Sequence, residues 1–222
     1  MFRTYWGPAR PKAYAPMKRA AFRTIVTSSF IMRNPPESAH RHAPTPLVFV
    51  SAKDWDQKST EGMNDLGSML TEKGFMSLFT DLYVSEINNS CDMLNLYSKE
   101  LRSNVQYAMA PFAPVFIARS TACLVTQKYI SSYPASGLVL ISPPASNADL
   151  MHEKLPTDLD EFIYEPKFPI AIMDTPERID KLKAKNRLCK ESNHFVDIIP
   201  VDKLGGQPLF SAVEKWLDQL GV

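Results

Sequence analysis

Short, almost continuous apolar runs alternate along the chain with longer amphipathic stretches. Strands buried on both faces of a parallel sheet show the first pattern, and helices packed on such a sheet show the second. The apolar runs predict six strands, at 47–51, 75–80, 115–118, 137–142, 169–173 and 195–201. The amphipathic stretches predict helices at 60–73, 91–104, 121–132, 176–190 and 209–220. This alternation predicts an α/β fold, a mostly parallel open sheet flanked by helices and joined by right-handed crossovers.

The first 36 residues differ from the rest of the chain in charge. They contain seven basic residues and no acidic residue, with apolar side chains spaced among them. Arg19 and Arg23 lie one helical turn apart, opposite an apolar face, as in the transit peptides that direct proteins into mitochondria. We therefore expect residues 1–36 to be a removable leader and the protein to be mitochondrial, most simply in the matrix. A disordered cytosolic tail is the alternative interpretation.

Behind the leader, four prolines in residues 34–46 predict a break in regular structure. We place a linker at 37–45 and one domain at 46–222. Of the 25 basic residues seven precede Glu37, which leaves 18 against all 24 acidic residues, a net charge of −6. An acidic body argues against a nucleic-acid partner. No apolar run approaches the ~20 residues that a transmembrane helix needs.

The sequence also predicts no metal site and no cofactor. The three cysteines are too widely spaced for a zinc site or a disulfide framework. The chain contains no Walker loop and no GxGxxG motif.

The main candidate chemistry lies in residues 114–144. A predicted strand ends at Ala118, a sharp turn carries Ser120, and a predicted helix begins at Thr121. A serine flanked two residues away on each side by small residues, here Ala118 and Ala122, is typical of a nucleophile elbow. Because open α/β sheets form their sites at the carboxyl ends of strands, Ser120 is a candidate nucleophile.

From residue 46 to the end the chain resembles the α/β-hydrolase fold family. The resemblance is carried by this elbow, by the strand GLVLISPP that follows it, and by the unit LTEKGFMSLFTDLY with its Asp81-Leu82 pair. It implies a serine hydrolase scaffold with a minimal lid in residues 145–168, and an acyl ester or thioester as the ligand class.

The resemblance also implies roles for particular residues. By position these roles fall on Ser120 as nucleophile, on Thr121 and Ala52 as oxyanion donors, on Asp174 as the acid, with Glu177 and Asp180 as weaker candidates, and on Gln207 in place of the histidine. Glutamine cannot accept and return a proton, and a serine hydroxyl is a poor nucleophile without a base. Acyl transfer by the standard route is therefore not expected.

Three other residues have weaker claims to chemistry. His152, in the lid segment, is an alternative base, and its other interpretation is a surface histidine. His194 precedes the last strand, so it is expected at the far end of the sheet from Ser120. Cys123 is expected to be a buried packing residue.

Two functions stay open. The first is a degenerate mitochondrial hydrolase that binds an acyl ligand or a protein partner. It rests on Gln207 and on Ser51-Ala52-Lys53 where the family has a His-Gly pair. The second is an active serine esterase or thioesterase, with Ser120 as nucleophile and a non-standard base such as His152. We favour the first, because a small residue can persist at an elbow for steric reasons alone.

Overall fold

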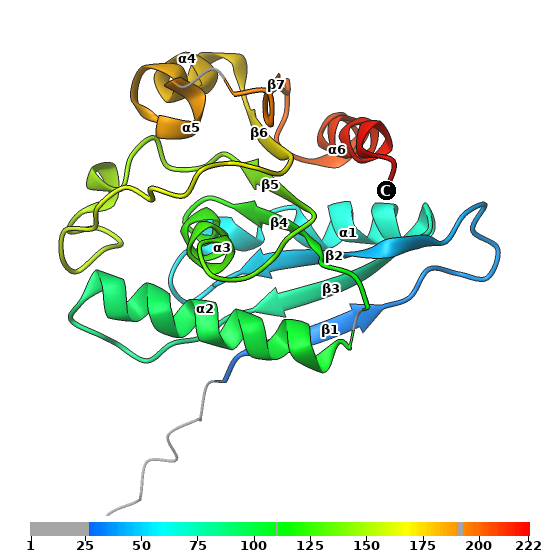
Figure 1. The fold of residues 1–222 in the computed structure, drawn as a ribbon, viewed down its shortest axis with the longest axis horizontal. Helices are drawn as coiled ribbons and strands as arrows, with labels where there is room; N and C mark the ends of the chain where they lie inside the picture. Colours follow the sequence, from blue (N-terminus) through cyan, green and yellow to red (C-terminus); the bar gives the residue numbers. More distant parts are fainter. Residues whose placement is uncertain (1–26, 110, 191–192) are drawn as a thin grey trace, which may run out of the picture.

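The computed structural model describes residues 27–109, 111–190 and 193–222, which form an open seven-stranded sheet between two layers of helices (Figure 1). The strands are β1 (Ser29–Arg33), β2 (Ala43–Ser51), β3 (Phe75–Asp81), β4 (Val115–Arg119), β5 (Gly137–Ile141), β6 (Ile170–Asp174) and β7 (Val196–Pro200). The α-helices are α1 (Met63–Glu72), α2 (Ser90–Tyr107), α3 (Ala122–Ile130), α4 (Pro176–Lys185), α5 (Arg187–Lys190) and α6 (Gly206–Leu220). Two short 3-10 helices are η1 (Gln57–Thr60) and η2 (Ala148–Leu150).

The order of the strands places the switch point of the sheet. It is β1-β3-β2-β4-β5-β6-β7, and all neighbours are parallel except β1 and β3. The six predicted strands and the predicted α/β class are confirmed, and the helix predicted at 176–190 is divided at Asn186 into α4 and α5. The chain runs from β2 to β3 on one side and then to β4 on the other. A crevice for ligands is therefore expected at the carboxyl ends of β2 and β4.

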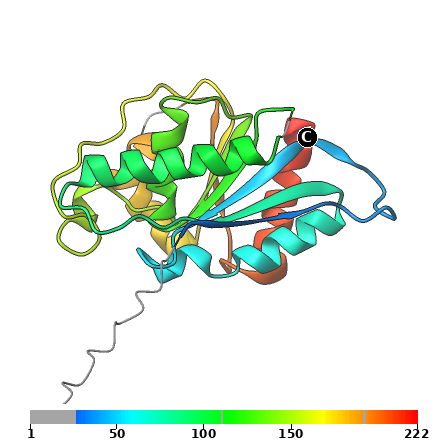
Figure 2. The ribbon, with the colours of Figure 1, turned by 90° about the horizontal axis from the view of Figure 1, so that it is seen from below.

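Two apolar cores hold the helices on the two faces of the sheet. Figure 2 shows α2 on one face and α1 with α6 on the other. Tyr97 and Leu101 of α2 pack on the first face, and Leu66 of α1 and Trp216 of α6 pack on the second. Burying each of these side chains stabilises the fold by about 1.5–3 kcal/mol. No helix in the described ranges is long and apolar enough to cross a membrane.

The structure places a strand inside the predicted leader. Residues 29–33 form β1, the antiparallel edge strand on β3. The Arg33 guanidinium lies 4.5 Å from the centre of the Phe79 ring, and Arg33 Nη1 donates to Ser68 Oγ at 2.6 Å. The sequence does not predict this strand. Its pairing partner β3 lies far away in the sequence, and the basic, acid-free composition around it predicts a leader instead. The amphipathic part of the predicted leader, before residue 27, falls outside the described residues.

The predicted linker at 37–45 also differs from the structure. β2 begins at Ala43 and continues through Pro44 and Pro46. The pairing of β2 with β3 shifts its register between Ala43 and Leu47. Prolines are tolerated at such irregularities because the missing N–H removes no ladder hydrogen bond there.

Candidate functional site

Ser120 lies in a strained turn between β4 and α3. Its φ is +55°, in the left-handed region that residues other than glycine rarely adopt. The turn is held by hydrogen bonds from the Ser120 N–H to the Ile141 carbonyl (3.0 Å) and from the Cys123 N–H to the Ser120 carbonyl (3.1 Å). Ala118 and Ala122 are fully buried, so the strand and the helix pass close together. The backbone at Ser120 is that of a nucleophile elbow.

The side chain of Asp56, which the sequence did not suggest, covers this turn. Ser120 Oγ donates to Asp56 Oδ2 at 2.7 Å, and the Thr121 hydroxyl donates to the same oxygen at 3.0 Å. The Thr121 N–H also points at Oδ2, at 3.4 Å. Asp56 follows β2, and its own N–H donates to the Ala52 carbonyl at 2.8 Å, which turns the carboxylate inward. A carboxylate therefore occupies the donor that the resemblance assigned to an oxyanion.

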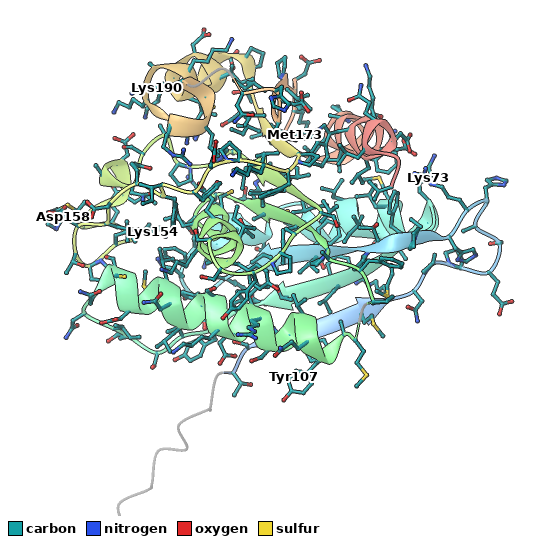
Figure 3. All side chains as sticks on the ribbon, viewed as in Figure 1. Lys73, Tyr107, Lys154, Asp158, Met173 and Lys190 are labelled. Atoms are coloured by element: carbon teal, nitrogen blue, oxygen red, sulfur yellow. The ribbon has the colours of Figure 1, made fainter. Side chains whose placement is uncertain are left out.

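Asp56 carries a negative charge at neutral pH. Burial, which leaves Asp56 4% exposed, would by itself raise its pKa. Hydrogen bonds from Ser120, Thr121 and the Lys58 N–H outweigh this effect and hold the pKa below its ordinary value of 3.8. The Lys154 ammonium, labelled in Figure 3, lies 3.6 Å from Asp56 Oδ1 and partly balances the charge.

The second proposed oxyanion donor is also engaged. Ala52 is fully buried, and its N–H donates to Ser59 Oγ at 3.0 Å. The Ser59 hydroxyl in turn donates to the Asp56 carbonyl at 2.6 Å. The loop after β2 thus closes on itself through η1 and directs none of these groups toward Ser120.

Asp174 lies where the sequence places the acid, at the end of β6, and it is paired with an arginine. It is fully buried, and its carboxylate accepts from Arg178 Nε and from the Thr175 N–H, both at 2.9 Å. The weaker candidates Glu177 and Asp180 are exposed on α4. The carboxylate that would orient a histidine in a working triad is therefore held by Arg178.

Gln207 lies in the first turn of α6, exposed to solvent, and its Nε2 donates to Ser211 Oγ at 3.2 Å. The loop before α6 is tied instead to Arg119, the residue before Ser120. Arg119 Nη1 donates to the carbonyls of Leu204 (2.7 Å) and Glu61 (2.6 Å). An arginine thus joins the loop that would carry the histidine to the start of α1.

The two histidines of the body lie apart from these contacts. His152 is exposed in the segment between β5 and β6, and its backbone N–H donates to the Leu155 carbonyl at 3.1 Å. His194 is exposed before β7, with its ring 4.0 Å from that of Phe195. Among the described residues neither imidazole forms a hydrogen bond to Ser120. Cys123 is fully buried as expected, and burial raises its pKa.

Sequence reasoning missed Asp56 and Arg178, although both left a signal. Asp56 lies on the loop after the first parallel strand, which flanks the same switch point as Ser120. Arg178 follows Asp174 by four residues at the start of a helix, a spacing that brings two side chains together. Within the described ranges, no group of three or more His, Cys, Asp or Glu side chains could hold a metal ion.

The arrangement opposes acyl transfer at Ser120. An attack by Ser120 Oγ would place a negative oxygen at the Thr121 N–H, where Asp56 already places a negative charge. Oxyanion holes accelerate reactions because their donors are free and aimed at the developing charge. Here the donor is occupied, the described residues place no base on Ser120 Oγ other than Asp56, and the low pKa of Asp56 makes it a weak proton acceptor.

Comparison with known proteins places the fold. Esterase 2 of Thermogutta terrifontis, phosphoramylated by tabun, superposes with a TM-score of 0.63 at 14% identity, over 88% of this chain and 90% of that one. The esterase domain of a Rhodothermus marinus protein gives 0.54 at 14% identity, over 86% and 96%. XC6422 of Xanthomonas campestris, an α/β serine hydrolase without a lid, gives 0.60 at 11% identity, over 86% and 88%.

These likenesses extend over most of each chain, and the chain has the α/β-hydrolase fold. The fold expected from the sequence is therefore confirmed. No family model matches the chain, and no curated protein matches its sequence. At these identities the likeness concerns the fold alone, so the activity has to be argued from the site.

Proposed function

We propose that this protein is a degenerate hydrolase, which uses the α/β-hydrolase scaffold for binding or complex assembly in mitochondria and does not turn over esters. The observation that carries the proposal is the Asp56 carboxylate, which accepts hydrogen bonds from both Ser120 and Thr121. A fixed negative charge at this place opposes the charge that acyl transfer must develop.

Three further features support the proposal. The acid position, Asp174, is paired with Arg178, and the histidine position holds Gln207, whose amide bonds to its own helix. Arg119 ties down the loop before α6. Each of these contacts pairs a polar group with another group of the protein, so these groups are not free to bind or activate a substrate.

The second candidate function is an active serine esterase or thioesterase. Two observations favour it: Ser120 retains a left-handed φ, which stores strain that evolution tends to keep at functional sites, and the similar structures are esterases. This function requires Asp56 to leave Ser120 and a base to approach it. His152 would have to move from its exposed position to serve.

A serine-directed fluorophosphonate probe separates the two functions. We expect the purified full-length protein to show no labelling above that of Ser120→Ala, and no turnover of p-nitrophenyl acetate or of an acetyl thioester. The physical reason is that Ser120 Oγ donates its proton to a weak base. Mass spectrometry of the labelled protein locates any modified residue.

Ser142→Ala is the matched control for this experiment. Ser142 follows β5 and also has a positive φ, of +49°. It is therefore a serine in a similarly strained backbone conformation, but outside the nucleophile elbow. Labelling that is lost in Ser120→Ala and kept in Ser142→Ala would contradict the degenerate function and support the esterase.

The mitochondrial address remains a proposal that rests on the composition of the leader. Because β1 is part of the sheet, the deletion that tests it is of residues 1–26, which keeps Ser29–Arg33. We expect the full-length protein with a C-terminal tag to co-localise with mitochondria and the shortened one to stay in the cytosol. Import of the shortened protein into mitochondria at an unchanged level would contradict the proposal that residues 1–26 direct the import.

A further inference from the structure

A cavity of about 620 Å³ lies next to the Ser120 site. Its walls come from the loops after β2 and β3, from α2, and from the segment between β5 and β6. Lys154, labelled in Figure 3, forms part of the wall and also lies beside Asp56. The cavity therefore adjoins the site described above, although Ser120 is not among its lining residues.

The floor of the cavity contains two aromatic rings that are fixed by a stack and by hydrogen bonds. The rings of Trp55 and Tyr97 stack with their centroids 5.2 Å apart and their planes at 22°. Trp55 Nε1 donates to the Lys154 carbonyl at 2.8 Å, and Lys154 Nζ donates to the Trp55 carbonyl at 3.0 Å. Buried Met93 and Leu155 complete the floor. Two reciprocal hydrogen bonds thus hold an aromatic face in place.

The rim of the cavity is acidic. Asp54, Glu86 and Glu153 are exposed, and none of them forms an ion pair with another described residue. The lysine in the wall, Lys154, has its ammonium turned to Asp56. Three unpaired carboxylates around an apolar floor create a negative potential inside the cavity.

Tyr97 offers the cavity a hydroxyl that no described residue engages. It is 3% exposed and lines the cavity, yet its hydroxyl forms no hydrogen bond within the described residues. Among the described residues the one buried side-chain N or O atom without a hydrogen-bond partner is Asn104 Nδ2, so the Tyr97 hydroxyl reaches the open space of the cavity. Burial first, and then the charges of Asp54 and Asp81, raise the pKa of Tyr97 to about 12. The hydroxyl is thus neutral at pH 7, and its oxygen can accept a hydrogen bond from a ligand.

We propose that this cavity binds an organic cation, an ammonium group carried on an apolar body. The three carboxylates attract the charge, and the aromatic face of Trp55 and Tyr97 contacts the apolar body and adds a cation–π attraction. The Tyr97 hydroxyl accepts a hydrogen bond from the ammonium. An anion would meet three negative side chains, and a purely apolar ligand would leave Tyr97 unpaired.

Titration of the full-length protein with n-hexylammonium tests the proposal. We expect binding by calorimetry at pH 7, together with a shift of the Trp55 indole N–H resonance. The neutral analogue 1-hexanol should bind about tenfold more weakly, because it lacks the charge. Neutralising the rim in Asp54→Asn/Glu86→Gln/Glu153→Gln should also weaken hexylammonium binding about tenfold.

The matched control removes the same charge elsewhere. Asp65→Asn/Glu72→Gln/Asp180→Asn changes three exposed carboxylates on α1 and α4, outside the cavity, and should leave the affinity unchanged. Tyr97→Phe should bind hexylammonium more weakly, because it lacks the hydroxyl that accepts from the ammonium. Equal affinity for hexylammonium and 1-hexanol, or an equal loss in both triple variants, would overturn the proposal.

This inference goes beyond the proposed function and is tested independently of it. Hexylammonium contains no ester, so its binding does not depend on whether Ser120 reacts. Failure of the titration would leave the fluorophosphonate result intact, and labelling of Ser120 would leave the cation site intact.

Discussion

Replacing Asp56 with alanine is expected to lower the free energy of unfolding by about 2–4 kcal/mol. The variant loses the acceptor of the Ser120 hydroxyl and of both Thr121 donors. Thr121 is 2% exposed, so its donors would be left buried without a partner. Chemical denaturation of the two proteins measures the difference. Asp54→Ala, which removes an exposed carboxylate two residues earlier, should stay within about 0.5 kcal/mol of the parent.

The pH dependence supplies a second readout of the same group. Because the pKa of Asp56 is lower in the folded protein than in the unfolded chain, its contribution is fully present above the unfolded value of about 3.8. It is lost as the pH falls through the folded value. The difference in free energy of unfolding between the parent and Asp56→Asn should therefore become smaller from pH 7 to pH 3. A gap that stays constant over this range would show that the carboxylate charge does not stabilise the fold.

A large effect of Asp56→Ala would mean that the Ser120 turn is maintained as a structural junction. Asp56 joins the loop after β2 to the start of α3, and Arg119 joins the start of α1 to the loop before α6. Both junctions lie at the carboxyl ends of the central strands, where a hydrolase keeps its groups free for substrate. Here those groups bind the fold itself, so the side chains at these strand ends contribute to stability.

The parts of the fold that follow from local pattern could be predicted from the sequence. The continuous apolar runs of β4 and β5 are buried on both faces, and α6 shows its apolar face at helical spacing. Ser120 could be placed because its turn lies directly between a strand and a helix. β1 could not, because its pairing with β3 joins distant segments and its acid-free, basic surroundings predict a leader instead.

The hydrogen bonds around Ser120 could not be predicted, because they join residues that are far apart in the sequence. Asp56 and Ser120 are 64 residues apart, and their contact depends on how the loop after β2 folds around Ser59. The resemblance predicts a histidine where the sequence has Gln207, but the sequence does not show which side chains contact the loop before α6. Arg119 answers that question only once the strand ends are brought together in the sheet.

Gly74→Ala is expected to destabilise the protein by about 3–5 kcal/mol, measured by chemical denaturation. Gly74 lies between α1 and β3 with a φ of +104°, which a residue with a Cβ rarely adopts. A Cβ at this position would collide with the backbone carbonyl of Arg41. The Gly74 carbonyl also accepts from the Ala43 N–H at 2.9 Å, so relief of the collision would move the first residues of β2.

Gly221→Ala separates the strain of a positive φ from the collision of the new Cβ with neighbouring atoms. Gly221 also has a positive φ, of +73°, but no atom within 4 Å would meet its Cβ. The substitution there should cost only the strain of the left-handed conformation, about 1 kcal/mol. The larger loss at Gly74 would then measure the close approach of the chain before β2 to the turn after α1. Equal losses at both glycines would mean that residues 41–43 move aside without cost, and that this junction does not help to hold β2 in register.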